Sequence, residues 1–333
     1  MITRSSARNQ QSDWTKELRD AYVDPLHLLD TLKLTTSDVS LPALPTNFAF
    51  RVPRPFVARM RRNDPSDPLL LQVLPQAAEL TAVPGFELDP VGDLESRKTP
   101  ALLHKYNGRA LLITTGGCAI NCRYCFRQHF PYAESAGRAE IKNALLAIEQ
   151  DSSICEIILS GGDPLMLQDH RLAEMFEQLG DIAHLRRIRI HTRLPVTIPA
   201  RITDELLRIL NRSRLTAVVV VHINHAAEID AELAAQLQRI TDAGVQVLNQ
   251  SVLLHGINDD DVALINLSEA LFAASVLPYY VHLLDPVAGA SHFKVDDDRA
   301  YAIATIMRNQ LPGYLVPRFV REIAGEASKT PFA

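Results

Sequence analysis

The chain has 333 residues, of which 47% are hydrophobic and 22% are charged, and its formal net charge is -5. These values are typical of a soluble globular protein, and the negative charge gives no electrostatic basis for binding nucleic acid. The longest apolar runs are too short to cross a bilayer, and the N-terminus lacks the apolar core of a secretory signal. We therefore expect a cytoplasmic protein that binds neither nucleic acid nor membrane.

The first hundred residues predict a mainly helical extension, residues 1–100. Apolar residues recur near helical spacing from Trp14 to Leu34, with an interruption at Pro25. A short helix is expected at Phe56–Arg62, and the prolines between residues 41 and 56 indicate irregular, extended chain. This extension suggests no chemistry by itself.

From about residue 103, short apolar runs alternate with amphipathic segments. The expected strands are 110–115, 154–160, 188–192, 216–223, 245–254 and 279–284, and the expected helices are 138–150, 169–179, 203–211, 229–243, 260–273 and 298–309. Apolar strands separated by helices indicate a parallel sheet covered by helices. About six such units fit an α/β fold of the partial (β/α)6 TIM-like barrel type better than a closed barrel of eight. Residues 101–312 are expected to form this core, and residues 313–333 a C-terminal segment.

Three of the four cysteines lie in the loop expected after the first strand. Cys118 and Cys122 are separated by three residues, and Cys122 and Cys125 by two. Cysteine thiolates suit iron–sulfur clusters and zinc. A structural zinc site needs four protein ligands, whereas a four-iron cluster held by three cysteines leaves one iron open to another ligand. The alternative is a zinc knuckle that borrows a histidine or Cys155, although Cys155 is better interpreted as a buried apolar residue.

This C-x3-C-x2-C motif, with Tyr124 before its last cysteine, resembles the signature of the radical S-adenosylmethionine (SAM) superfamily. The resemblance implies that Cys118, Cys122 and Cys125 hold a [4Fe-4S] cluster whose open iron binds SAM and, once reduced, cleaves it to a 5′-deoxyadenosyl radical. The second strand ends in Ser-Gly-Gly-Asp-Pro, which alone indicates only a turn. In the superfamily the equivalent segment contacts SAM, so SAM contacts are expected from Gly161, Gly162 and Asp163.

The C-terminal segment resembles that of one particular family within this superfamily. Residues 325–331, Gly-Glu-Ala-Ser-Lys-Thr-Pro, resemble the ending of the lysine 2,3-aminomutase family. That family's lysine binds pyridoxal 5′-phosphate (PLP) covalently, which assigns Lys329 as the catalytic, cofactor-binding lysine. A tail lysine is otherwise a solvated charge, and Lys294 is the rival candidate, interpreted as structural.

Further matches to this family imply the remaining contacts. The PLP phosphate is expected to be held by Lys105, Tyr106, Arg109 and Arg193, where Lys105 replaces an arginine of the clostridial-type enzymes with a point charge. His222 and Gln250 match positions that contact SAM. A lone histidine at a strand end is otherwise a hydrogen-bonded structural residue.

Substrate recognition is implied by one arginine and two acids. Arg127 matches the arginine that holds the substrate carboxylate, for which bidentate pairing is apt. Asp285 and Glu322 match the two carboxylates that hold the distal ammonium group of lysine. The family's usual second acid is aspartate, so Glu322 reaches about one methylene further. The alternative for either acid is a surface salt bridge.

The resemblance implies conversion of (S)-α-lysine to (R)-β-lysine, an isomerase reaction. Within the family the chain resembles the short bacterial enzymes that supply β-lysine for the modification of elongation factor P. The expected partners are lysine, a reductant such as flavodoxin or ferredoxin, and the β-lysine ligase, with a homo-oligomer left open. The alternatives are an aminomutase for another amino acid, a radical SAM enzyme without PLP, and a non-catalytic iron–sulfur or zinc protein.

Overall fold

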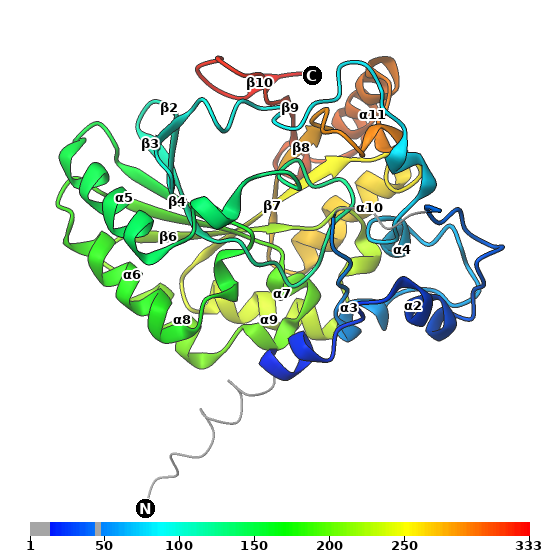
Figure 1. The fold of residues 1–333 in the computed structure, drawn as a ribbon, viewed down its shortest axis with the longest axis horizontal. Coiled ribbons are helices and arrows are strands. Elements are labelled where there is room, and N and C mark those ends of the chain that lie inside the picture. The colour runs from blue at the N-terminus through cyan, green and yellow to red at the C-terminus, as the bar shows by residue number, and fades with distance from the viewer. Residues whose placement is uncertain (1–13, 44–47) are drawn as a thin grey trace, which may run out of the picture.

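Parallel strands form the centre of the fold in the computed structural model, which describes residues 14–43 and 48–333 (Figure 1). They are hydrogen-bonded in chain order: β3 (Arg109–Thr115), β4 (Glu156–Gly161), β5 (Arg187–Thr192), β6 (Thr216–His222), β7 (Gln246–Leu253), β8 (Leu277–Leu283) and β9 (Arg318–Arg321). The first six confirm the six expected strands. β9 was not predicted, because four residues with charges at both ends form no recognisable pattern.

Helices connect these strands and cover the outside of the sheet. They are α5 (Arg138–Gln150), α6 (Asp169–Asp181), α7 (Leu194–Thr197), α8 (Asp204–Arg212), α9 (Ala231–Asp242), α10 (Asp261–Ala273) and α11 (Asp297–Gln310). Side-chain caps set several starts: Thr203 Oγ1 accepts from Leu206 N at 3.0 Å before α8, and Asp230 and Asp260 cap α9 and α10 in the same way. Apolar residues of the strands and helices pack into one hydrophobic cluster.

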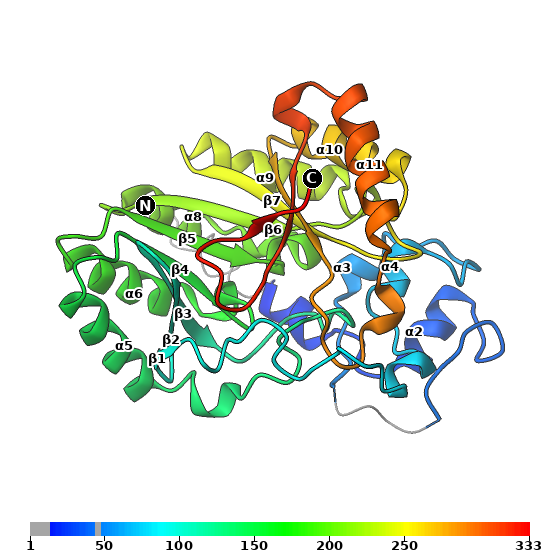
Figure 2. The same cartoon turned by 90° about the horizontal axis from the view of Figure 1, so that it is seen from above.

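Antiparallel strands complete the two ends of the sheet. β1 (Arg97–Thr99) and β2 (Leu102–Tyr106) lie before β3, and β10 (Thr330–Pro331) pairs with β9. In the described part of the chain the sheet order runs from β1 to β10 without closing on itself. The partial barrel is therefore confirmed, and Figure 2 shows the C-terminal segment crossing its open side.

The N-terminal extension contains short helices joined by longer irregular segments. Residues 14–19 are helical, followed by α2 (Pro25–Leu32), α3 (Arg54–Val57), α4 (Pro68–Leu71) and the 3-10 helix η1 (Ala77–Leu80). The interruption expected at Pro25 is present, because Asp24 caps α2 and Pro25 occupies its first turn. The extension has its own hydrophobic cluster, which also contains Ile120 of the cysteine loop. Within the described ranges, no helix combines the length and apolarity that crossing a membrane requires.

Further 3-10 helices lie in the loops, namely η2 (Tyr132–Glu134), η3 (Pro164–Met166), η4 (Pro199–Arg201), η5 (Ala226–Glu228), η6 (Ser291–Phe293) and η7 (Gly313–Leu315).

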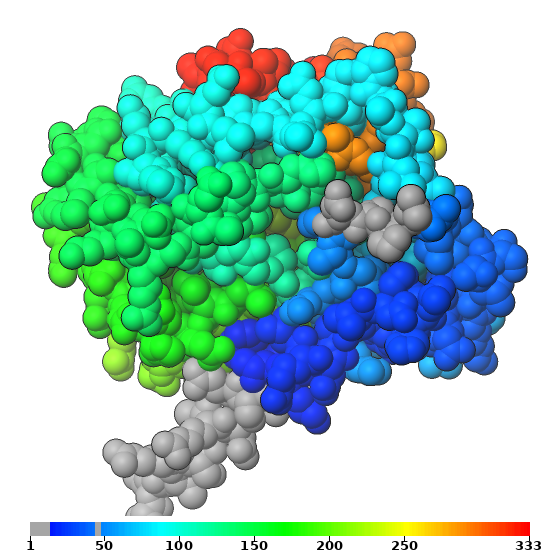
Figure 3. All heavy atoms as spheres, in the orientation of Figure 1, coloured from blue at the N-terminus to red at the C-terminus, as the bar shows by residue number. Residues whose placement is uncertain are grey.

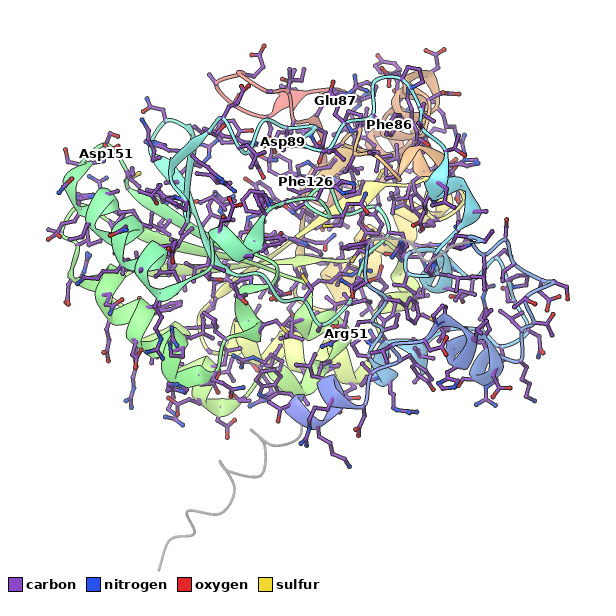
Figure 4. All side chains as sticks on the ribbon, in the orientation of Figure 1. Arg51, Phe86, Glu87, Asp89, Phe126 and Asp151 are labelled. Carbon is purple, nitrogen blue, oxygen red and sulfur yellow. The ribbon has the colours of Figure 1, made fainter. Side chains whose placement is uncertain are left out.

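The segment 86–93, called the strap here, connects two parts of the fold. Glu87 N donates to Pro286 O, and Ala288 N donates to Glu87 O, both at 2.8 Å. The strap thus joins the extension to the loop after β8, and Figure 3 shows this part of the chain in cyan across one face, near the red C-terminal segment. Figure 4 labels Glu87 and Asp89 on it.

Candidate active site

The cysteine loop begins where β3 ends, as expected from the position of chemistry in parallel α/β folds. Cys125 N donates to Cys122 O at 3.1 Å, and the loop is fastened to the extension because Arg123 N donates to Gln72 O at 2.9 Å. Arg123 also pairs through its guanidinium with Glu79 of η1. The extension therefore holds the loop in shape.

The three thiols of this loop are free and mutually close. Burial raises the pKa of Cys118, with neighbouring Asp163, Cys125 and Cys122 adding to the effect, and burial raises the pKa of Cys125 to about 11. Among the described residues, no three His, Cys, Asp or Glu side chains are arranged around a single metal ion. Iron–sulfur clusters are bound by cysteine thiolates, and three such donors on one loop fit a [4Fe-4S] cluster.

Two glycines at the end of β4 pack directly against the cysteine loop. A Cβ on Gly162 would lie 2.3 Å from Gly117 O, and one on Gly161, whose φ is +123°, would lie 2.4 Å from Thr115 O. Only glycine permits this approach of two backbones. The neighbouring Asp163 has a structural role, because its carboxylate accepts from Thr192 Oγ1 and Arg193 N, each at 2.7 Å. Its backbone is occupied as well, because Asp163 N donates to Gly117 O at 2.8 Å and Asp163 O accepts from Met166 N at 3.0 Å, so the SAM contact expected from Asp163 stays a prediction.

A cavity of about 370 Å³ opens inside the barrel, beside the cysteine loop. This volume lies within the range of small-molecule sites. Alternate residues of the strands face it: on β5, for example, Arg189 and His191 line the cavity while Ile188 and Ile190 are buried in the hydrophobic cluster. The inner face of the sheet is thus more polar than the expected apolar strands implied. Phe126, which follows the last cysteine, also lines the cavity and is labelled in Figure 4.

Lys329 reaches this cavity from the turn between β9 and β10. Its Nζ donates to Glu322 Oε2 at 2.6 Å and lies 6.0 Å from the centre of the Tyr280 ring. Lys105 Nζ donates to Glu322 Oε1 at 3.1 Å. Burial acts to raise the pKa of Glu322, but the cations of Lys329 and Lys105 prevail and lower it to about 2. The amine is accordingly held inside the barrel by an ionised carboxylate.

Asp285 lies beside this group with an unsatisfied carboxylate. It lines the cavity, and its buried Oδ1 has no hydrogen-bond partner. Burial, together with the negative charge of Glu322, raises its pKa to about 7. Buried polar atoms are normally hydrogen-bonded, so an unpartnered oxygen aimed into a cavity marks a place for a donor on a ligand.

Asp93 of the strap connects two expected ligand-binding cations. Its Oδ2 accepts from Arg127 Nε and its Oδ1 pairs with Lys105 Nζ, both at 2.6 Å, and Arg127 Nη1 also donates to Ser160 Oγ at 3.0 Å. Burial opposes ionisation of Asp93, but Arg127 and Lys105 hold its pKa below its usual value. Arg127 and Lys105 therefore face the cavity with their orientations already set.

His222 and Gln250 meet at the cavity wall, with Gln250 Nε2 and His222 Nε2 3.0 Å apart. Burial, with Arg193 and Arg127 nearby, lowers the pKa of His222 to about 3, so the ring is neutral and accepts from the amide. Two histidines that sequence reasoning missed also line the cavity. The Nε2 atoms of His191 and His282 are buried and have no hydrogen-bond partner in the protein.

Of the four residues expected at the PLP phosphate, the structure places three at the cavity and one outside it. Arg109 stacks on the Tyr106 ring at 4.6 Å, and both line the cavity together with Lys105. Arg193 does not line the cavity. Arg189, which lies four residues earlier and within β5, lines it instead. Arg189 Nε donates to Glu156 Oε1 at 2.8 Å. The alternation of residues 187, 189 and 191 was the sequence signal that would have identified Arg189.

The class of this protein follows from the fold and the cysteine loop. The family model of the radical SAM superfamily matches residues 112–267, which span β3 to α10 and contain all three loop cysteines. The protein is a radical SAM enzyme.

The relatives define the family within that class. The chain is 48% identical to L-lysine 2,3-aminomutase of Escherichia coli over 96% of this chain and 94% of that protein, and 47% identical to the protein of the same name from Haemophilus influenzae over 97% and 96%. It is 35% identical to L-lysine 2,3-aminomutase of Clostridium subterminale over 81% of this chain and 65% of that protein. The chain belongs to the lysine 2,3-aminomutase family, a family of isomerases that use a [4Fe-4S] cluster, SAM and PLP.

Proposed function

We propose that this chain is an L-lysine 2,3-aminomutase that converts (S)-α-lysine to (R)-β-lysine. The observation that carries the proposal is one cavity that contains Lys329, the unpartnered carboxylate of Asp285 and the oriented guanidinium of Arg127. An amine anchor, an anionic group and a cationic group are what a PLP enzyme needs to hold a dibasic amino acid.

The bound cofactors would supply the radical that removes a hydrogen from Cβ and the π-system through which the amino group moves from Cα to Cβ. The protein's own contribution is positioning and exclusion of water. Lys329 would hold PLP, with Tyr106, Arg109 and Arg189 around its phosphate. The backbone at Gly161 and Gly162, with His222 and Gln250, would hold SAM beside the cluster.

The substrate would be held at both ends. Arg127 would bind the carboxylate, because Asp93 and Ser160 leave its remaining N–H groups directed into the cavity. Asp285 and Glu322 would bind the distal ammonium group, which supplies the donor that Asp285 lacks. Glu322 also pairs with Lys329 in the free protein, so its ion pair would be exchanged when PLP occupies the lysine.

Two partners extend this proposal. The cluster requires an electron from a reductant such as flavodoxin or ferredoxin. We further propose that the β-lysine serves the modification of elongation factor P through a β-lysine ligase. The support is similarity over nearly the full length of the short bacterial relatives, as compared with 65% of the clostridial protein.

The test is anaerobic incubation of the reconstituted protein with SAM, PLP, dithionite and lysine, followed by chromatography of the amino acids. Formation of β-lysine is expected. Lys329→Ala should abolish it together with the PLP absorbance band, whereas Lys294→Ala should retain both, because Lys294 is exposed and lies outside the cavity. Isomerisation of another amino acid with lysine returned unchanged would refute the substrate.

A further inference from the structure

Arg193 lies outside the cavity and contacts one of the cluster cysteines. Its Nη1 donates to Cys122 Sγ at 2.8 Å, and the same nitrogen contacts the Tyr124 hydroxyl group. Its Nη2 donates to Gln72 Oε1 at 2.6 Å and to Glu228 Oε2 at 3.0 Å. The guanidinium is therefore fixed between the cysteine loop, the extension and the loop after β6.

This group is shielded from solvent. Arg193 is 5% exposed and Glu228 is fully buried, and the guanidinium carbon lies 5.5 Å from the centre of the Phe56 ring. Charges in such a dry environment interact more strongly than charges at a surface. A positive charge thus contacts the sulfur of a cluster ligand, and the carboxylate of Glu228 pairs with that same cation.

We propose that Arg193 raises the reduction potential of the cluster held by Cys118, Cys122 and Cys125, and that Glu228 opposes it. Reduction adds one electron and makes the cluster more negative. A hydrogen-bond donor and a positive charge at a cluster sulfur stabilise the reduced cluster, because hydrogen bonds and local charge set iron–sulfur potentials. A buried carboxylate behind that cation has the opposite effect.

The extension takes part in this arrangement through Gln72, the residue that follows α4. Its side-chain oxygen accepts from Arg193, and Asn224 Nδ2 donates to the same oxygen at 2.9 Å. Gln72 Nε2 in turn donates to Glu228 Oε1 at 3.2 Å. The inference rests on the three-cysteine cluster and not on lysine as substrate, so a different substrate would leave it standing.

The experiment is an anaerobic redox titration of the reconstituted cluster, followed by electron paramagnetic resonance, with iron and sulfide per chain measured in every sample. Arg193→Met should lower the midpoint potential. The loss of a hydrogen bond to a charged group should decrease the ratio of reduced to oxidised cluster about tenfold at fixed potential, or ~59 mV for a one-electron couple. Glu228→Gln should shift the midpoint in the opposite direction, and Arg193→Lys should retain most of the wild-type value.

Arg59→Gln is the matched control. Arg59 donates to Val196 O at 2.5 Å and also to the backbone carbonyl of Glu228, and its guanidinium lies 5.5 Å from the same Phe56 ring. It pairs with Asp230 and leaves the Glu228 carboxylate and the cysteine sulfurs uncontacted in these interactions. Its replacement should shift the midpoint less than Arg193→Met does. Unchanged midpoints at full cluster content, or shifts in the same direction for Arg193→Met and Glu228→Gln, would overturn the proposal. If Arg193→Met fails to retain iron, Arg193→Lys and Glu228→Gln decide, and wild-type potentials in Glu228→Gln would refute it.

Discussion

Replacement of Asp285 by asparagine tests the substrate site most directly. Its pKa of about 7 means that the carboxyl group is mostly neutral at pH 6 and mostly ionised at pH 8. The side-chain ammonium of lysine, with a pKa of about 10.4, stays charged throughout. The KM of the wild-type protein for lysine should therefore fall about tenfold between these pH values, because only ionised Asp285 pairs with the ammonium group.

The expected magnitude follows from the charge that the variant lacks. A hydrogen bond to a charged group contributes ~1.5–3 kcal/mol, so Asp285→Asn should raise KM at pH 8 by roughly one to two orders of magnitude. The variant should also lose the tenfold change in KM that is expected for the wild type between pH 6 and pH 8. Initial rates of β-lysine formation, measured from pH 6 to 9, would provide both values.

The same variant should be more stable than the wild type in the absence of lysine. The folded protein raises the pKa of Asp285 from 3.8 to about 7, so its contribution to stability is present below pH 3.8 and is lost as the pH rises through 7. At 1.36 kcal/mol per pKa unit, this loss is about 4 kcal/mol. The Tm advantage of Asp285→Asn should therefore be larger at pH 8 than at pH 5.

Glu326→Gln is the control, because Glu326 is an exposed acid of the same C-terminal segment as Glu322. It should leave KM and its pH dependence unchanged. Wild-type KM values in Asp285→Asn, or a pH dependence that persists in it, would refute the assignment of Asp285 to the ammonium group.

Two further predictions concern the cysteine loop and the strap. Gly162→Ala should displace the loop, because the new Cβ would lie 2.3 Å from Gly117 O; we expect less iron per chain and a loss of ~1–3 kcal/mol in the free energy of unfolding. Gly180→Ala in α6, where the Cβ meets nothing within 4 Å, should retain all iron, and equal iron content in both variants would contradict the first expectation. Asp93→Asn should reduce kcat/KM for lysine at least tenfold, since Arg127 loses the ionised partner that orients it; wild-type kcat/KM would show that this pairing is dispensable.

Most of the fold could be predicted because its signals are local. Each of the six expected strands is an apolar run flanked by a helix pattern, and such runs need no knowledge of distant contacts. β9 could not be predicted in this way. Its buried residues Phe319 and Val320 form a strand only by pairing with β8, which is distant in sequence. The extension was expected to be more helical than it is, because apolar spacing continued where prolines and turns end each helix.

The site residues show the same difference between local signals, which the sequence reveals, and distant contacts, which it does not. Lys329 and the cysteines lie in compact motifs, whereas Asp93 contacts Arg127 across 34 positions of sequence without a local signal. Arg189 lies within β5, whereas Arg193 follows its last residue and is the N-cap residue of α7 with φ -112° and ψ -8°, so the alternation that directs Arg189 to the cavity no longer holds at Arg193. Treating the strands as apolar on both faces concealed Arg189 and the neighbouring histidine.

Because Lys329 lies on the last hairpin, the order of synthesis separates the two halves of the site in time. The cysteine loop leaves the ribosome roughly 200 residues before this lysine, which at 5–20 residues per second is an interval of about 10–40 s. The cysteine loop of a nascent chain would thus be available to iron and sulfide before Lys329, the proposed PLP lysine, has been synthesised. Maturation would then proceed from the inorganic to the organic cofactor, and a polypeptide interrupted before residue 329 would contain the cysteine loop without the lysine of the cavity.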